Sequence, residues 1–287
     1  MARDHDTAHG GEPPVLYEVA GRVARITLNR PAQRNALSAQ VTAGLLSAFA
    51  RARSDDTARV VVLTGAGEKS FCAGGDLSDL ARLGADGAAG NPAGDVDGAS
   101  SAAEADGAGA RSDAVRLFSA FRDLGKPVIA RIAGHALGGG LGLAVSCDVA
   151  IAAGDVKLGT PEIKVGLWPM MIMAVLNRNI APKQALKLYY TGELISAAEA
   201  ARIGLISEAV ARDDLDGRVD ELATSIAAKS PAALRLGRAA FFDIEGRPLP
   251  DQLAYLHGQL AALAATDDAR EGIAAFLEKR APRFTGN

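Results

Sequence analysis

The spacing of apolar and polar residues changes along the N-terminal part of the chain. Residues 16–19 and 23–28 alternate between apolar and polar positions on either side of a glycine, which predicts a β-hairpin. In 38–49, apolar residues recur at helical spacing after a serine that can cap a helix. A β-branched run at 59–64 then predicts a buried strand. This order predicts an α/β fold built from stacked β-β-α units.

The rest of the chain divides by composition. Residues 1–14 are polar and acidic and predict a disordered tail ahead of a core at 15–190. Seventeen of the thirty residues of 84–113 are Gly or Ala and none is aromatic, so this segment cannot bury enough surface to offset its ordering entropy. We expect a flexible insertion there. The pattern of 191–287 predicts a helical C-terminal region with breaks at glycine and proline.

Composition and charge exclude several classes of protein. Among 287 residues, 48% are hydrophobic and 23% are charged, which is typical of a globular protein with a full core. The 31 basic residues do not exceed the 34 acidic ones, so we expect no nucleic-acid partner. No apolar run reaches the ~20 residues needed to span a membrane. Cys72 and Cys147 have no paired spacing, which favours packing roles in a reducing cytoplasm.

Two glycine-rich segments, well separated in sequence, carry the candidate chemistry. They read FCAGGDL at 71–77 and GHALGGGLGL at 134–143, and each follows a β-branched run. Backbone N–H groups left unpaired where such strands end can converge on one substrate oxygen and form an oxyanion hole. A third segment, Pro161-Glu162-Ile163, offers a carboxylate for moving protons. The combination indicates enolate chemistry on a thioester.

The same glycines also suit a phosphate-binding loop or close helix packing. A dinucleotide fingerprint needs G-x-G-x-x-G, and the glycines at 138–140 have no third glycine at the required position. Residues 65–70 lack the G-x-x-x-x-G-K-[ST] spacing of a P-loop. The oxyanion hole is therefore the favoured interpretation.

These segments resemble those of the crotonase superfamily, the enoyl-CoA hydratase/isomerase group, and the likeness runs from about residue 15 to 284. Further matching pieces, in the family's order, are NRP at 29–31, NAL at 35–37, VVLTG at 61–65, TGE at 191–193 and the tail at 265–280. The resemblance implies a crotonase-like spiral of stacked β-β-α units, followed by a helical C-terminal region that trimerises and commonly pairs trimers into hexamers.

Matched to the family's motifs, Gly75 and Gly139 would donate the two N–H groups to a thioester oxygen. Glycine suits both positions because a side chain would obstruct the approach of that oxygen. Gly139 would also begin a helix, whose dipole favours negative charge at that end. Glu162 takes the family's acid/base position, and we expect partial burial to raise its pKa toward neutrality.

One position departs from the pattern of the family's hydratases. They carry a second glutamate where this chain has Gly142, so that two carboxylates together orient and deprotonate one water. A single Glu162 resembles instead the Δ3-Δ2-enoyl-CoA isomerases, in which one carboxylate moves a proton between carbons. The segment 166–171, with Trp168, either provides a bulky apolar wall that excludes water or packs in the core.

The resemblance also implies contacts with coenzyme A. Around the first glycine-rich segment these contacts are Arg34, Ala36, Ala73, Asp76, Leu77 and Ser78. Phe276 and Lys279 match positions that close the pocket, often from a neighbouring subunit. Asp76 is also suited to capping a turn, and Lys279 to a solvated helix end.

We therefore expect a cytoplasmic enzyme that isomerises or hydrates enoyl-CoA thioesters as a homotrimer or hexamer. No metal or redox cofactor is expected to be needed, and coenzyme A is part of the substrate. Two other classes stay open. A non-catalytic acyl-CoA binder with the same fold would bind CoA esters without turnover, whereas a structural assembly protein would not bind them.

Overall fold

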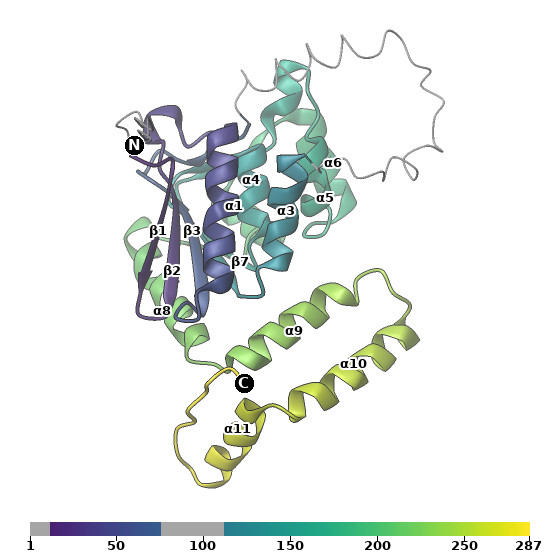
Figure 1. Cartoon of the computed structure of the whole chain (residues 1–287). Helices are drawn as coiled ribbons and strands as arrows, with labels where there is room; N and C mark the ends of the chain where they lie inside the picture. Colours follow the sequence, from purple (N-terminus) through teal and green to yellow (C-terminus); the bar gives the residue numbers. More distant parts are fainter. Residues whose placement is uncertain (1–11, 76–111) are drawn as a thin grey trace, which may run out of the picture.

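A six-stranded sheet is the larger layer of the computed structural model, which describes residues 12–75 and 112–287 (Figure 1). In sheet order its strands are β1 (Val15–Ala20), β2 (Val23–Leu28), β3 (Val60–Gly65), β5 (Val128–Ile132), β7 (Val149–Ala153) and β10 (Glu208–Val210). β1 and β2 form the predicted antiparallel hairpin, and the pairs from β2 to β10 are parallel. Parallel neighbours need crossovers, and helices supply several of them here.

A smaller sheet lies beside the first and ends at the glycine-rich segments. Its strands, in order, are β4 (Ser70–Cys72), β6 (His135–Leu137), β8 (Lys157–Gly159) and β9 (Leu194–Ser196). β4, β6 and β8 are parallel, and β9 is antiparallel to β8. The carboxyl ends of parallel strands meet at one edge, so the segments that follow β4, β6 and β8 meet there too.

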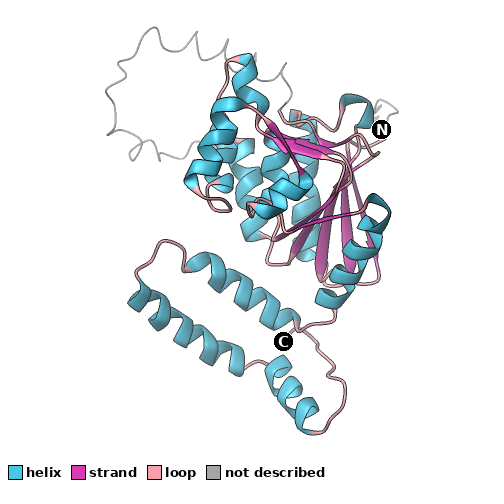
Figure 2. Ribbon diagram, turned by 180° about the vertical axis from the view of Figure 1, so that it is seen from behind, coloured by secondary structure: helices cyan, strands magenta, loops and turns pink. Residues whose placement is uncertain are grey.

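Helices cover both faces of the larger sheet: α1 lies in front of it in Figure 1, and α8 in front of it in Figure 2. The helices of the core are α1 (Ala39–Ser54), α3 (Asp113–Asp123), α4 (Gly139–Ser146), α5 (Met170–Leu176), α6 (Pro182–Thr191), α7 (Ala197–Arg202) and α8 (Leu215–Ala227). Short 3-10 turns are η1 (Pro31–Gln33), η2 (Pro161–Val165) and η3 (Arg212–Asp214). Ser38 caps α1 by accepting the Val41 N–H, as its sequence predicts.

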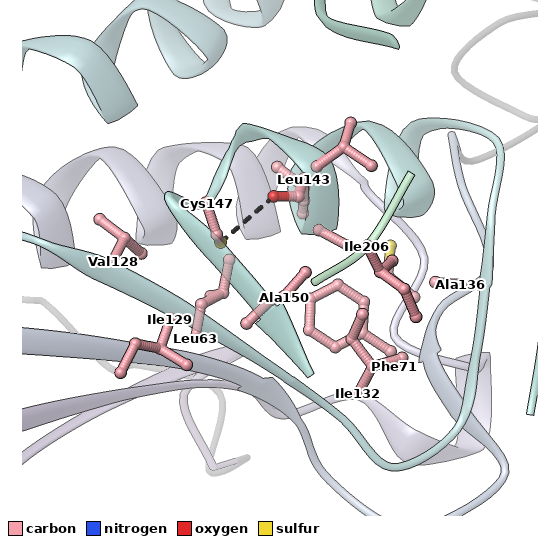
Figure 3. Packing of buried hydrophobic residues seen from close by; sticks show 14 of the residues in the cluster. Leu63, Phe71, Val128, Ile129, Ile132, Ala136, Leu143, Cys147, Ala150 and Ile206 are labelled. Carbon is pink, nitrogen blue, oxygen red and sulfur yellow. Dashed lines mark hydrogen bonds between the residues drawn. The ribbon is translucent and has the colours of Figure 1, made fainter. Parts of the chain in front are cut away.

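The core encloses α4, which is apolar on every side. Its residues 140–145 are buried, and Figure 3 shows Leu143 of this helix among other buried apolar side chains. A methyl group added to Gly140 would collide with the carbonyl group of Cys72. Glycine therefore lets α4 lie directly against β4, which brings the second glycine-rich segment next to the first.

The last three helices form a C-terminal arm that extends away from the core (Figure 1). The arm consists of α9 (Pro231–Asp243), α10 (Leu249–Ala264) and α11 (Asp267–Leu277). No residue of α10 is buried, although the helix is rich in Leu and Ala. Large apolar side chains exposed on the arm are Phe241, Leu249, Leu253, Leu260, Ile273, Phe276 and Leu277. Such an extended apolar surface is typical of an interface.

Some sequence-based expectations differ from the structure or fall outside it. β9 and β10 lie beyond residue 190, where the pattern predicts helices, because each is a short strand that completes a sheet begun earlier in the chain. The tail predicted at 1–14 and the insertion predicted at 84–113 fall almost wholly outside the described residues. Within 12–75 and 112–287, no helix has the length and apolarity needed to cross a membrane.

Candidate active site

Three segments converge where the strands of the smaller sheet end. β4 leads to Gly74 and Gly75, β6 leads to Gly138, and β8 leads to η2, which carries Glu162. The N–H of Gly138 donates to the carbonyl of Gly159 over 2.9 Å and so holds the second segment beside the third. Gly74 and Gly138 have φ values of +100° and +52°, which favour glycine.

The two backbone amides predicted to form an oxyanion hole lie close together. A methyl group added to Gly139 would lie 3.5 Å from the amide nitrogen of Gly75, and one added to Gly74 would lie 3.3 Å from the amide nitrogen of Gly139. Within the described residues neither amide donates to a backbone carbonyl. Gly139 is the first residue of α4, so its N–H has no intrahelical acceptor. Both N–H groups can therefore donate to a substrate oxygen.

The carboxyl group of Glu162 lies against the second glycine turn. Its Oε1 is 2.7 Å from the position of a methyl group added to Gly138. Burial raises the pKa of Glu162, because the charged form loses solvation. Its Oε2 is buried and has no hydrogen-bond partner within the described residues. A buried carboxyl oxygen without a partner is costly to keep, which makes Glu162 a candidate for binding or proton transfer.

Two residues near Glu162 were not singled out in the sequence. Thr160 is fully buried, and its hydroxyl has no hydrogen-bond partner within the described residues. Tyr189 of α6 is buried, and the nearby charge of Glu162 adds to burial in raising its pKa. Its hydroxyl donates to Oδ1 of Asn177 over 2.9 Å. Neither residue belongs to a recognisable motif, so only their buried positions reveal them.

Trp168 packs through its ring. Its indole meets Tyr189 and Tyr190 edge to face, with ring centroids 5.7 and 5.5 Å apart. It is partly buried against the core. These ring contacts support the interpretation that Trp168 packs in the core. Because Tyr189 lies near Glu162, its contact with Trp168 also places the indole on the Glu162 side of the core.

Gly142 lies one turn after Gly138 on α4. A methyl group added there would lie 3.0 Å from Cβ of Ile172, closer still to its Cγ2, and 3.2 Å from Cε1 of Phe118. Ile172 is buried on α5 and Phe118 lies on α3. Side chains from two other helices thus occupy the space where a second carboxylate would begin.

The loop before α1 supports the first glycine turn. Ala73 donates its N–H to the carbonyl of Arg34, and Leu37 donates to the carbonyl of Gly74. Asn35 is fully buried with φ +55°, and its side chain donates to the carbonyls of Ala66 and Ser70 over 3.0 and 2.7 Å. Asn35 therefore positions this loop, a role that its tolerance of left-handed backbone suggests but its motif alone does not show.

Among the described residues predicted to contact coenzyme A, those beside the first glycine turn lie apart from those at the C-terminal end. Ala36 lies next to Asn35 beside the first glycine turn, but Asp76, Leu77 and Ser78 lie outside the described residues. Phe276 in α11 and Lys279 just after it are exposed, and Figure 1 shows α11 well away from α4, the helix that begins at the second glycine turn.

Other reactive side chains are poorly placed for chemistry. Burial raises the pKa of the Cys72 thiol to about 12, which leaves too little thiolate for a nucleophile. His135 is exposed, and its Nδ1 accepts the N–H of Lys157 over 3.0 Å. No group of three or more His, Cys, Asp or Glu in the described part of the chain is arranged to hold a metal ion.

Comparisons with known proteins agree on one family. Residues 18–287 match the family model described as enoyl-CoA hydratase/isomerase. The chain is 37% identical over 274 residues to (E)-benzylidenesuccinyl-CoA hydratase of Thauera aromatica, covering 95% of this chain and 99% of the relative. It is 33% identical over 271 residues to crotonyl-CoA hydratase of Syntrophomonas wolfei subsp. wolfei, covering 94% and 97%.

Solved structures agree with this. The enoyl-CoA hydratase from Bacillus anthracis superposes with a TM-score of 0.83 at 33% identity, covering 96% of this chain and 100% of that one. The enoyl-CoA hydratase of Mycobacterium smegmatis superposes with a TM-score of 0.82 at 32% identity, covering 95% and 99%. The crotonase-like α/β fold predicted from the sequence is thereby confirmed.

Proposed function

Because this chain belongs to the enoyl-CoA hydratase/isomerase family, we propose that it moves the double bond of an enoyl-CoA thioester, with Glu162 as the single acid/base group. The observation that supports this is the partly buried Glu162 carboxyl against Gly138, beside the paired amides of Gly75 and Gly139. In this proposal the two amides receive the thioester oxygen and Glu162 faces the carbons next to it.

Isomerisation then needs one carboxylate and no external reactant. Glu162 takes a proton from C2 of a 3-enoyl thioester, and the electron pair moves through the carbonyl group to give an enolate held by the two amides. Glu162 returns the proton to C4 as the double bond shifts to C2–C3, so the carboxylate is restored. Each amide is expected to supply about 3 kcal/mol of transition-state stabilisation. No metal or redox cofactor takes part in this step.

Hydration is the second candidate, because relatives over nearly the full length of the chain are named as hydratases. Hydration bonds the hydroxyl group of a water to C3 and adds a proton to C2, so it requires a water held beside Glu162. The place for a second carboxylate is filled at Gly142, so we propose that hydration is the weaker activity. Isomerisation of a 3-enoyl-CoA is then expected to be at least as fast as hydration of crotonyl-CoA.

Steady-state assays with both esters test this proposal. Glu162→Gln is expected to lower the isomerisation kcat at least ~10²-fold, because general acid–base catalysis supplies that much or more. Glu221→Gln, the same change at an exposed position of α8, is the matched control and is expected to keep wild-type rates. Isomerisation that survives Glu162→Gln would contradict the proposal. Strong hydration that only Glu162→Gln abolishes would favour the second candidate.

A non-catalytic binder gives a different result. Calorimetry would show tight binding of a CoA ester that Glu162→Gln leaves unchanged, with no turnover in either protein. A structural assembly protein would bind no CoA ester.

We also propose that Phe276 and Lys279 complete the CoA pocket of a neighbouring subunit in a trimer or hexamer. Both are exposed on the C-terminal arm, whose apolar surface has no cover within the described chain. A Lys side chain can pair with a phosphate of coenzyme A. Lys279→Ala is expected to raise KM for CoA esters and leave kcat nearly unchanged.

A further inference from the structure

Position 142 is the place on α4 from which another side chain would face Glu162. The N–H of Gly142 donates to the carbonyl of Gly138 over 3.0 Å, so the two residues are one turn apart. Side chains on a helix lean toward its N-terminus and cover the preceding turn. A side chain at 142 would therefore lean over Gly138, against which Oε1 of Glu162 lies.

Ile172 occupies this place. The two of its atoms that crowd position 142 are Cβ and Cγ2, which lie at the base of the side chain and not at a flexible end. A β-branched side chain has little freedom at χ1, so Ile172 cannot turn aside without a shift of α5. It is also only 3% exposed, so other packed atoms surround it. Phe118 approaches with an aromatic edge, which a smaller adjustment can move.

The side chains that fill position 142 are apolar. Ile172 and Phe118 offer no hydrogen bond, and Oε2 of Glu162 has no partner within the described residues. Hydration requires a water whose oxygen bonds to C3 while one of its protons passes to a carboxylate and a proton is added to C2. An apolar neighbour cannot orient that water, whereas isomerisation needs none.

We propose that Ile172 is a specificity-determining residue: its side chain excludes a second carboxylate and an oriented water from the space beside Glu162. This inference rests on the proposed function of Glu162 in proton transfer. It means that reaction choice depends on positions 142 and 172 together, since a glutamate at 142 cannot fit while Ile172 is present.

The test is a set of variants at these two positions, assayed for hydration of crotonyl-CoA and isomerisation of a 3-enoyl-CoA. Gly142→Glu alone is expected to lower the melting temperature and leave the hydration-to-isomerisation ratio unchanged. Combined with Ile172→Ala, the same glutamate has room, so the double variant is expected to recover most of the lost melting temperature and raise that ratio at least ~10-fold.

Two controls separate the role of Ile172 from a general loss of packing. Ile172→Val keeps both atoms that crowd position 142, so Gly142→Glu with Ile172→Val is expected to resemble Gly142→Glu alone. Leu176→Ala removes a fully buried side chain one turn further along α5. With Gly142→Glu it is expected to lower the melting temperature further without changing the ratio.

Each outcome decides the proposal. It is overturned if Ile172→Ala does not relieve the cost of Gly142→Glu, if Gly142→Glu alone raises the ratio, or if the relieved double variant keeps the wild-type ratio. A wild type that turns over neither ester contradicts the proposed function instead. If the wild type is inactive but the double variant hydrates crotonyl-CoA, the role of Ile172 is still supported. If the double variant does not hydrate it either, the role of Ile172 is overturned as well.

Discussion

At the scale of single residues, Glu162 links activity to pH. Burial raises its pKa, so between the ordinary and the raised value the folded chain holds a proton that the unfolded chain has lost. The stability contributed by this group is therefore present at acid pH and lost as pH rises through the raised pKa. Because isomerisation begins with the carboxylate as base, kcat/KM is expected to rise over the same window.

Glu162→Gln is expected to be more stable than the wild type at neutral pH. The amide is never charged, so it avoids the cost of a buried carboxylate, and the difference should vanish below the ordinary carboxyl pKa. Melting temperatures of both proteins across acid and neutral pH measure this. A constant difference across that range would show that Glu162 does not carry the pH effect.

The contact between Gly138 and Glu162 leads to a prediction about kcat. Gly138→Ala places a methyl group 2.7 Å from Oε1 of Glu162 and must displace the carboxyl group. A displacement of about 1 Å can cost ~10²-fold in rate, so kcat is expected to fall that far. Gly125→Ala is a matched control, because Gly125 also has positive φ, at +72°, but has no atom within 4 Å of the added methyl group.

Gly125→Ala is expected to lose stability and keep the wild-type kcat, because the backbone strain at Gly125 lies outside the candidate active site. Equal kcat losses in the two variants would mean that backbone strain, and not the contact with Glu162, limits catalysis.

At the scale of elements, ion pairs connect α9 to the core, and the pair of Arg238 with Asp148 is more buried than that of Asp243 with Arg122. Arg238 donates to both carboxylate oxygens of Asp148 over 3.0 and 2.9 Å and to the carbonyls of Arg122 and Phe121. The two side chains are only 8% and 22% exposed. Removing one member of such a pair leaves a poorly solvated charge and two carbonyls without their donor.

Arg238→Ala is therefore expected to lower the free energy of unfolding by ~3 kcal/mol, measured by denaturant titration. Limited proteolysis is expected to cut the C-terminal arm earlier than in the wild type. Arg235→Ala, at an exposed position of the same helix, should change neither result by more than ~0.5 kcal/mol. If both variants lost stability equally, general damage to α9 would explain the effect better than the ion pair.

At the scale of the whole molecule, the C-terminal arm exposes large apolar side chains on all three of its helices. Phe241 and Leu253 are 70% and 59% exposed, and each would contribute ~1.5–3 kcal/mol if buried between subunits. Phe241→Glu with Leu253→Glu is expected to shift the sedimentation coefficient toward that of a monomer and to raise KM for CoA esters. Val19→Glu introduces the same charge at an exposed apolar position of β1 and should leave the sedimentation coefficient unchanged. A double variant that keeps the wild-type sedimentation coefficient would show that Phe241 and Leu253 are not part of an interface between subunits.

Local patterns in the sequence were enough to predict several helices and strands of the core. The hairpin of β1 and β2, the capped α1 and the buried β3 follow from alternation, helical spacing and a serine cap, because neighbouring residues along the chain determine all three. The glycine-rich segments were also visible, since glycine marks close approach and unusual backbone angles wherever they occur. Their likeness to one family added the roles of Gly75, Gly139 and Glu162, which stay predictions.

Contacts between distant parts of the chain were decided only by the tertiary structure. The amides of Gly75 and Gly139 lie side by side because β4 and β6 are neighbours in one sheet, and no local pattern states that pairing. The sequence indicated at Gly142 that a second carboxylate was missing, but it could not indicate that Ile172 fills the place of that carboxylate. The physical reason is that backbone preferences act between near neighbours in the chain, whereas burial and steric fit depend on which residues folding brings together.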